Sequence, residues 1–336
     1  MVGHSVGDRF ELTALIAAGG AGDVYAAVDR EGGRTVAVKL FGPSWARDED
    51  AHVRLADDLE RVAALALPEV VPYLVVGRLS DGRPYVVTQL AFGSSLETVL
   101  ARGARLDAAE VVALLTGIGA ALDTAHASGV ILRTLSPKKL LLTWEPRQEP
   151  LVIVGVGTGA LLAIGASARA PTVDIGTYNS LAYCAPEATE SSAGPAADVY
   201  TVAAIAYQLM AGALPAGGMH TGDDPLKQLA AKRHAQAGAM REASRTPFAD
   251  AIEEVLGHAL SAEPGERYQT VGDFLADLSR AAQERAIRGP SRGRLRETGM
   301  FEPGRTRDVA ASLLALIERD RGHPSDADTR PHRIPD

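Results

Sequence analysis

A glycine-bearing run near the N-terminus contains the residue types that a phosphate-binding loop uses. It extends from Ile16 to Tyr25, reads IAAGGAGDVY, and lies between two stretches of β-forming residues. Glycines let the backbone approach phosphates and direct N–H groups toward them. Lys39 ends the run VAVK, at the distance from the loop at which a lysine reaches the α- and β-phosphates of a nucleotide. The loop alone also fits an ordinary hairpin turn, and Lys39 favours the nucleotide interpretation.

The elements that must position these residues are strands first and helices later. Residues 10–90 are predicted to be mostly strand, with one helix at 52–67 whose apolar residues recur at helical spacing. The clearest later helix begins after Asp107, where Glu110 completes a capping box, and ends before Gly129. The predicted helices of this second part span residues 107–128, 196–211, 250–260 and 271–287.

The domain boundaries follow from these elements and from a change in composition. We predict a β-rich lobe at 8–90, a helical lobe at 91–287 and a tail at 288–336. From Arg285 onward the chain has eleven Arg against eight Asp or Glu, so the tail is basic. The tail is predicted to be mostly disordered, with a short amphipathic helix at 309–319.

Bulk composition excludes several classes of protein. The 336 residues are 46% hydrophobic and 23% charged, as in globular proteins, and carry a net charge of −8. No overall basic field is present to recruit nucleic acid. The single cysteine, Cys184, excludes an intrachain disulfide and is interpreted as a packed residue. No signal peptide and no apolar run of about 18 residues is found, so we expect a cytoplasmic protein without a membrane span.

The loop and its lysine are similar to those of the eukaryotic-like (Hanks-type) serine/threonine protein kinases of bacteria. The loop follows their G-x-G-x-x-G-x-V pattern, except that Ala17 stands at the first glycine. The resemblance implies a two-lobed α+β kinase fold that binds ATP. It also implies a helix carboxylate that pairs with Lys39, placed at Asp58, with Asp57 and Glu60 as rivals. The positions that the resemblance assigns to nucleotide binding are Ile16, Gly19, Gly20, Gly22, Val24, Ala37, Lys39, Asp58, the gatekeeper Thr88 and Leu141.

The resemblance fails at the positions that carry catalysis. The family's catalytic loop reads H-R-D-L-K-P-x-N, and here residues 132–139 read LRTLSPKK. The family's metal-binding D-F-G follows a strand, and here G-V-G follows the apolar residues 151–154. The replaced positions are Thr134 for the catalytic aspartate, Ser136 for the lysine, Lys139 for the metal-binding asparagine and Gly155 for the metal-binding aspartate.

These replacements predict a degenerate member of the family, a pseudokinase without catalytic residues or a metal site. Gly155 has no side chain to hold Mg²⁺, Lys139 repels a cation, and Thr134 cannot accept a proton from an attacking hydroxyl. A general base alone contributes roughly 10²- to 10⁴-fold to a rate. An ammonium of Lys138 or Lys139 could replace the metal charge, which leaves open ATP binding without Mg²⁺.

Three functions remain open from the sequence. The first is a non-catalytic scaffold or allosteric regulator of a protein partner. The second is an atypical active kinase that transfers the ATP γ-phosphate to protein, with Glu145, Glu149 or Asp174 as substitute carboxylates. The third is an inert module whose nucleotide site is filled. A dinucleotide fingerprint at residues 155–159 is a weaker alternative, because every flanking motif matches a kinase.

Candidate modification sites suggest the class of partner. Retained Arg133 could bind a phosphate that an active kinase places on the activation segment, and Thr298 in the tail could be read by a phosphothreonine-binding domain. The alternatives are that the activation segment is not phosphorylated and that the tail around Thr298 is an ordinary linker. The candidate phosphate acceptors in the segment are Thr158, Thr172, Thr177 and Ser180.

The structural signatures downstream are intact. Glu187 stands in the sequence YCAPE, which resembles the A-P-E end of the activation segment. Asp198 resembles the helix aspartate that holds the catalytic-loop backbone. Arg267 is the arginine expected to pair with Glu187. The resemblance covers residues 8–283 and predicts the fold.

Overall fold

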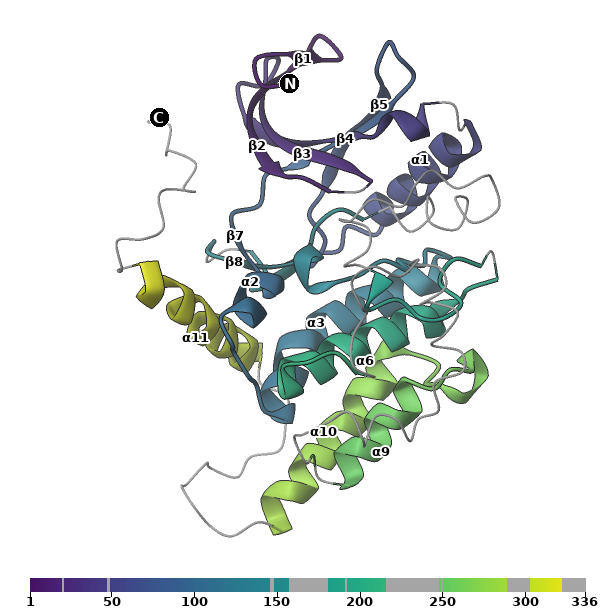
Figure 1. Ribbon diagram of the computed structural model, residues 1–336, viewed down its shortest axis with the longest axis vertical. Helices are drawn as coiled ribbons and strands as arrows, with labels where there is room; N and C mark the ends of the chain where they lie inside the picture. Colours follow the sequence, from purple (N-terminus) through teal and green to yellow (C-terminus); the bar gives the residue numbers. More distant parts are fainter. Residues whose placement is uncertain are drawn as a thin grey trace.

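Strands at the start of the chain form one curled antiparallel sheet, and helices form the layer beneath it (Figure 1). The sheet runs in the order β1-β2-β3-β4-β6-β5, and a small sheet, β7-β8-β9, lies in the helical part. This is the predicted two-lobed arrangement. The computed structural model describes residues 1–19, 21–46, 49–145, 148–156, 181–190, 192–215, 248, 250–288 and 303–321.

The element bounds agree with most of the sequence predictions. The first helix begins and ends three residues earlier than the predicted 52–67. In the sheet-rich part the elements are β1 Ser5–Val6, β2 Phe10–Ala17, β3 Gly22–Asp29, β4 Thr35–Phe41, the 3₁₀ turn Pro43–Trp45, α1 Glu49–Ala64, β5 Tyr73–Arg78 and β6 Pro84–Gln89. In the helical part they are β7 Gly93–Ser95, α2 Leu96–Ala101, α3 Ala108–Ala127, the 3₁₀ turn Pro137–Lys139, β8 Leu140–Thr143, β9 Leu151–Ile153, α6 Pro195–Ala211, α9 Asp250–Ala259, the 3₁₀ turn Pro264–Glu266, α10 Val271–Arg288 and α11 Pro303–Arg321.

Alternation along β4 positions Lys39. Val36, Val38 and Leu40 are buried and join the core of the sheet. Because successive side chains of a strand point to opposite faces, Ala37 and Lys39 share the other face. The lysine therefore lies on the face of β4 opposite to the sheet core.

α1 packs against the end of β4 by its apolar side. Leu55 and Leu59 are buried with Phe41 of β4 and Val86 of β6 in a separate small core. The four-residue spacing of the two leucines places them on one face of the helix. This packing fixes how α1 sits beside Lys39.

The helical lobe is built on α3 and α6, two helices that are buried on most sides. The predicted capping box of α3 is present, because the Asp107 side chain accepts from Glu110 N and the Glu110 side chain accepts from Asp107 N, each at 2.8 Å. Gly119 allows close packing on α10, since a Cβ there would lie 2.8 Å from Leu275. Within the described residues, α3 has the length and apolar composition of a membrane span, but 61% of its most apolar window is buried inside the structure.

α11 corrects the prediction for the tail. The helix expected at 309–319 is longer, Pro303–Arg321, and it lies along α2 and α3 of the helical lobe (Figure 1). Its buried residues belong to the same core as α3 and α6. The tail is therefore partly ordered, and its other residues lie outside the described part of the chain.

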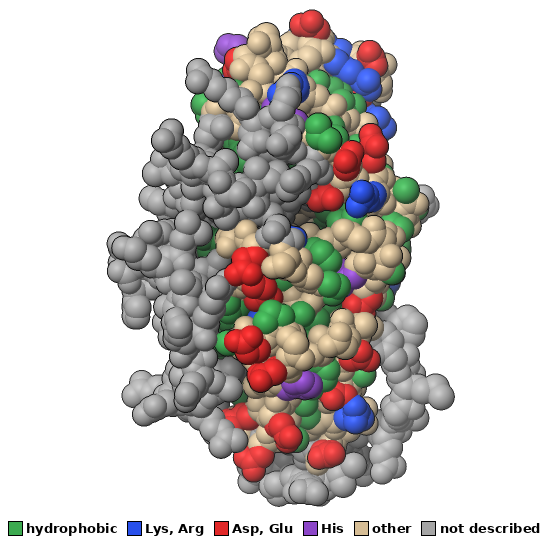
Figure 2. Space-filling model, turned by 90° about the vertical axis from the view of Figure 1, so that its right-hand side faces the viewer, with side chains coloured by type: hydrophobic (Ala, Val, Ile, Leu, Met, Phe, Trp, Pro, Cys, Tyr) green, Lys and Arg blue, Asp and Glu red, His purple; other side chains and the backbone are tan. Residues whose placement is uncertain are grey.

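Charge is unevenly distributed on the face that carries α9. Asp and Glu side chains gather over the lower half of this face (Figure 2). α9 itself contributes Asp250, Glu253 and Glu254.

Candidate functional site

Three lysines from the two lobes converge between the sheet and the helical lobe. Lys39 is half-buried on β4, and its pKa is lowered to about 7 by desolvation and then by the charges of Lys139 and Lys138. Those two lysines lie in the 3₁₀ turn Pro137–Lys139. The Lys39 ammonium lies over the ring of Phe41, 4.8 Å from its centroid. The site therefore concentrates positive charge where a nucleotide phosphate would sit.

The predicted ion pair between Lys39 and Asp58 is wrong. No ion pair between them occurs in the described residues, and no carboxylate is among the charges that shift the Lys39 pKa. Desolvation lowers the pKa of Arg133, and the charges of Asp198 and then of Asp58 on α1 oppose that shift. The rivals Asp57 and Glu60 are solvent-exposed.

Thr134 and Lys139 bind each other in the catalytic loop. The Lys139 ammonium donates to Thr134 Oγ1 over 2.6 Å, and Thr134 is 7% exposed. Desolvation lowers the pKa of Lys139 to about 8, although the nearby Cys184 and Asp198 favour its charged form. An ammonium and a hydroxyl thus occupy the positions where the family pattern has an amide oxygen and a carboxylate.

The two remaining replaced positions offer no carboxylate either. Ser136 is 2% exposed, and its hydroxyl has no hydrogen-bond partner in the described part of the chain. Gly155 has φ +69, and a Cβ built there would meet open space. The described residues contain no group of three His, Cys, Asp or Glu side chains that could hold a metal. These positions do not fit Mg²⁺, because proteins bind it through one or two carboxylates and none of the four supplies one.

The glycine loop contacts the 3₁₀ turn that carries Lys138 and Lys139. Gly22 N donates to Gly19 O over 2.9 Å, which makes a tight turn between β2 and β3. A Cβ on Gly22 would lie 2.0 Å from Leu40 O, so only glycine fits against β4. The Lys138 ammonium donates to Ala18 O over 3.1 Å and links the catalytic loop to the glycine loop. Gly20 lies outside the described residues.

The other predicted nucleotide-binding positions lie on strands of both lobes. Ala37 of β4 lies opposite Thr88 of β6 in the sheet register, and Val24 of β3 lies opposite Lys39. Leu141 lies on β8 in the lobe below and is half-buried. Ile16 is 49% exposed near the end of β2. The sheet thus brings Val24, Ala37 and Thr88 onto neighbouring strands.

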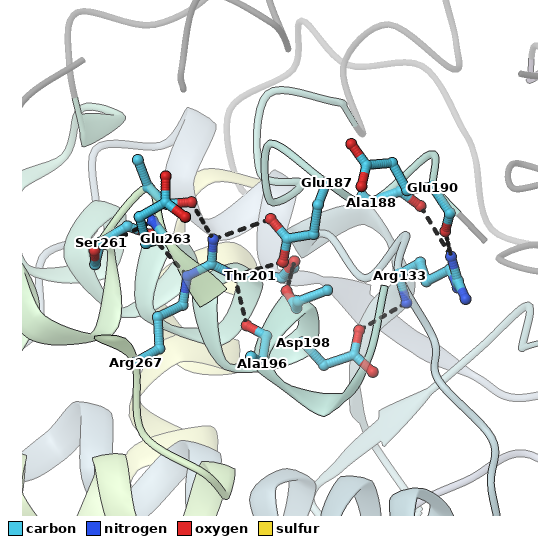
Figure 3. Close-up of polar contacts among 12 residues, drawn as sticks. Arg133, Glu187, Ala188, Glu190, Ala196, Asp198, Thr201, Ser261, Glu263 and Arg267 are labelled. Atoms are coloured by element: carbon cyan, nitrogen blue, oxygen red, sulfur yellow. Dashed lines mark hydrogen bonds and ion pairs between the residues drawn. The ribbon is translucent and has the colours of Figure 1, made fainter. Parts of the chain in front are cut away.

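Asp198 organises the catalytic-loop backbone, as predicted (Figure 3). Its buried carboxylate accepts from Leu132 N at 2.8 Å and Arg133 N at 2.7 Å. His126 Nε2 is 2.9 Å from the same carboxylate. His126 was not among the predicted site residues; a histidine shortly before residues 132–139 was the available signal.

Arg133 does not present its side chain for a phosphate. Its backbone has φ +57, a conformation that is uncommon outside glycine. Its guanidinium donates to the main-chain oxygens of Ala188 at 3.3 Å, Ala193 at 3.0 Å and Glu190 (Figure 3). Arg133 therefore anchors the segment after Glu187. The four candidate phosphate acceptors, Thr158, Thr172, Thr177 and Ser180, lie outside the described residues.

The predicted pair of Glu187 and Arg267 is present and buried. The two guanidinium contacts to the carboxylate are 2.6 and 3.0 Å (Figure 3). Arg267 also donates to the main-chain oxygens of Ser261, Ala196 and Ala262, and it stacks on the ring of Tyr200 at 5.0 Å. The end of the activation segment is thus attached to the core of the helical lobe.

Comparison with known proteins places this framework in a family. The protein kinase domain family matches residues 10–277. The chain is 31% identical over 284 residues to the serine/threonine-protein kinase PknE of Mycobacterium bovis, which covers 82% of the chain and 47% of PknE. It is 31% identical over 278 residues to PknA of Mycobacterium tuberculosis, which covers 76% of the chain and 63% of PknA. The chain thus spans about half the length of the PknE proteins that it matches.

A solved structure shows the same fold. The kinase domain of Mycobacterium tuberculosis PknI superposes with a TM-score of 0.62 at 22% identity, over 84% of this chain and 99% of that chain. The matched residues include both lobes and the interlobe lysines. The chain therefore belongs to the protein kinase family, and its relatives are bacterial serine/threonine kinases of the Hanks type.

Proposed function

We propose that this protein is a pseudokinase that binds ATP without a metal ion, transfers no phosphate, and acts as a scaffold or allosteric regulator. The observation that carries the proposal is the 2.6 Å contact between Lys139 and Thr134, beside a glycine at position 155. Phosphoryl transfer depends on positioning and on charge neutralisation by metal ions. An ammonium at the metal position favours an anion and disfavours Mg²⁺.

The lysines favour a phosphate chain that carries its full charge. Lys39, Lys138 and Lys139 come from both lobes, and their mutual repulsion contributes to the lowered pKa of Lys39. Phosphate oxygens between them would relieve that repulsion, because opposite charges at close range favour the charged form of each group. Free ATP carries more negative charge than its magnesium complex and is therefore the better ligand.

The test is a thermal-shift titration with ATP in EDTA, with Lys39→Ala as the variant and Arg83→Ala as a control outside the site. A ligand that binds only the folded state must raise the melting temperature. We expect a shift for the unmodified chain and for the control, and none for Lys39→Ala. If ATP does not raise the melting temperature of the unmodified chain, the proposal is wrong and the chain is an inert module whose nucleotide site is filled.

The atypical active kinase is the alternative that the same samples test. Glu145 and Glu149 lie in the connection between β8 and β9, away from the 3₁₀ turn that carries Lys139, and Asp174 lies outside the described residues. Phosphate incorporation measured by mass spectrometry after incubation with ATP and Mg²⁺ or Mn²⁺ should be zero. Incorporation that Lys39→Ala abolishes would contradict the pseudokinase.

The proposal also includes the cellular location of the protein and the class of its partner. A cytoplasmic protein with a protein partner, either an active kinase or a phosphothreonine-binding domain, fits the acidic domain and its threonine-bearing tail. Nucleic acid is not expected as a partner, because the domain has a net negative charge. Co-precipitation with an active kinase of the same cell, before and after Thr298→Ala, tests the partner class.

A further inference from the structure

α11 lies on a surface that we call the α2–α3 face. This face consists of α2 and α3, with Arg102 at the end of α2 and Ala113 within α3 (Figure 1). α11 is the last described element and follows α10 by way of residues 289–302. It lies on the α2–α3 side of the helical lobe.

One stripe of α11 holds it on the face. Val309, Ala310, Leu313 and Ile317 are between 1% and 7% exposed. Their spacing of one, three and four residues puts them on one side of a helix. Ala311, Ser312 and Glu318 are exposed on the other side. α11 is thus an amphipathic helix whose apolar stripe is covered by the lobe.

Among the described residues, three hydrogen bonds join α11 to the lobe, and each ends on a main-chain oxygen. Arg102 donates to Ile317 O and Thr306 Oγ1 donates to Ala113 O, each at 2.7 Å. Arg307 donates to Gln148 O at 3.5 Å. The Arg102 contact is to the main-chain oxygen of a stripe residue, Ile317, and not to a particular side chain. Any helix with the same apolar spacing offers a main-chain oxygen at that position.

α11 is covalently joined to α10, and the number of connecting residues limits its reach. Residues 289–302 are 14 residues, counted from the end of α10 at Arg288 to the start of α11 at Pro303. An extended chain spans at most about 3.3–3.6 Å per residue. A tether of this length keeps α11 near the face at high effective concentration, and still permits exchange with a competing helix.

We propose that the α2–α3 face is a docking site for an amphipathic helix, that α11 fills it in cis, and that a protein partner presenting a helix with the same apolar spacing replaces α11. The helix of the partner carries apolar residues at positions i, i+1, i+4 and i+8, and the main-chain oxygen of the i+8 residue meets Arg102. The face consists of α2 and α3 and does not include Lys39, Lys138 or Lys139, so we expect the helix to bind there without nucleotide.

The test uses a labelled synthetic peptide of residues 303–321 and the full chain in three forms. Ala310→Asp places a charge on the buried stripe, and Ala311→Asp places the same charge one residue away on the exposed side. Binding of the peptide is measured by fluorescence anisotropy, and each form is melted in parallel.

We expect Ala310→Asp to bind the peptide at least ~tenfold more tightly than the unmodified chain, because it vacates a site otherwise held by a tethered competitor. Ala311→Asp should behave as the unmodified chain does. Adding Arg102→Met to Ala310→Asp should weaken the peptide again. The proposal is overturned if Ala310→Asp gains no peptide affinity, if it loses its cooperative melting transition, or if Ala311→Asp gains as much.

Discussion

Raising the pH should weaken the binding of metal-free ATP, because Lys39 must carry its proton to attract phosphate. The pKa of Lys39 in the free protein is about 7, lowered by desolvation and by the charges of Lys139 and Lys138. Bound phosphate favours the protonated form and so raises that pKa. Affinity is therefore full below the free-state pKa and is lost as the pH rises above it.

The size of the effect follows from the protonated fraction. A group with a pKa of about 7 is protonated in roughly a quarter of the molecules at pH ~7.5 and in roughly 1% at pH ~9. If only that form binds, the dissociation constant rises about twentyfold across this window. Lys139 has a pKa of about 8, so its deprotonation also weakens ATP binding as the pH rises. The second ionisation of a phosphate lies near ~6, so the charge of ATP changes little there.

The assay is isothermal titration calorimetry of ATP in EDTA at both pH values. Lys39→Ala is the matched variant. It should bind ATP weakly at both pH values, and its affinity should keep only the smaller pH dependence that comes from Lys139. Proton uptake on binding, read from buffers of different ionisation enthalpy, should accompany the unmodified reaction. An affinity that stays constant or increases between the two pH values would refute the reasoning.

Two further predictions concern the framework and the replaced positions. Glu187→Gln leaves the buried Arg267 without its counter-charge, and breaking such a pair costs about 3–5 kcal/mol, so the melting temperature should fall by about 10 °C in calorimetry. The triple variant Thr134→Asp, Lys139→Asn, Gly155→Asp restores the oxygen ligands and the base. It should acquire a thermal shift with ATP that requires Mg²⁺, whereas Gly155→Asp alone should not, because the Lys139 ammonium remains.

Matched control variants separate the expected changes in melting temperature and in magnesium dependence from nonspecific destabilisation. Glu263→Gln removes an exposed carboxylate on the same side of the lobe and should leave the melting temperature within about 1 °C. Lys138→Asn removes a site charge without supplying a metal ligand at position 139 or 155. A magnesium-dependent shift in Lys138→Asn, or an unchanged melting temperature in Glu187→Gln, would contradict the account.

Local and motif-based features could be predicted from the sequence. Asp107 and Glu110 form the capping box because the two residues are three apart and depend on nothing else in the chain. Glu187 and Arg267 are 80 residues apart, yet the pairing followed from the two motifs that contain them.

Side-chain direction could not be predicted where packing decides it. Leu55 and Leu59 fix the rotation of α1, and Asp58 acts on Arg133 and not on Lys39. A positive φ at Arg133 turns its guanidinium among main-chain carbonyls, and no sequence pattern signals that conformation at a non-glycine residue. The retained arginine is therefore structural.

The surface on which α11 packs could not be predicted from the sequence either. Apolar spacing predicted a helix at 309–319, but not the surface that covers it. The contact from Arg102 to Ile317 O spans 215 residues and has no counterpart in a local pattern. Docking also extends the helix to Pro303–Arg321, because tertiary packing stabilises turns that are marginal in an isolated segment.

The measurement that tests the central claim most directly is a pair of ATP titrations by calorimetry, one in EDTA and one in excess Mg²⁺. The account predicts tighter binding in EDTA, because Lys139 and Gly155 leave the metal without ligands while three lysines attract the free phosphate chain. Tighter binding in Mg²⁺ would contradict it and would show that this site holds a metal–nucleotide complex.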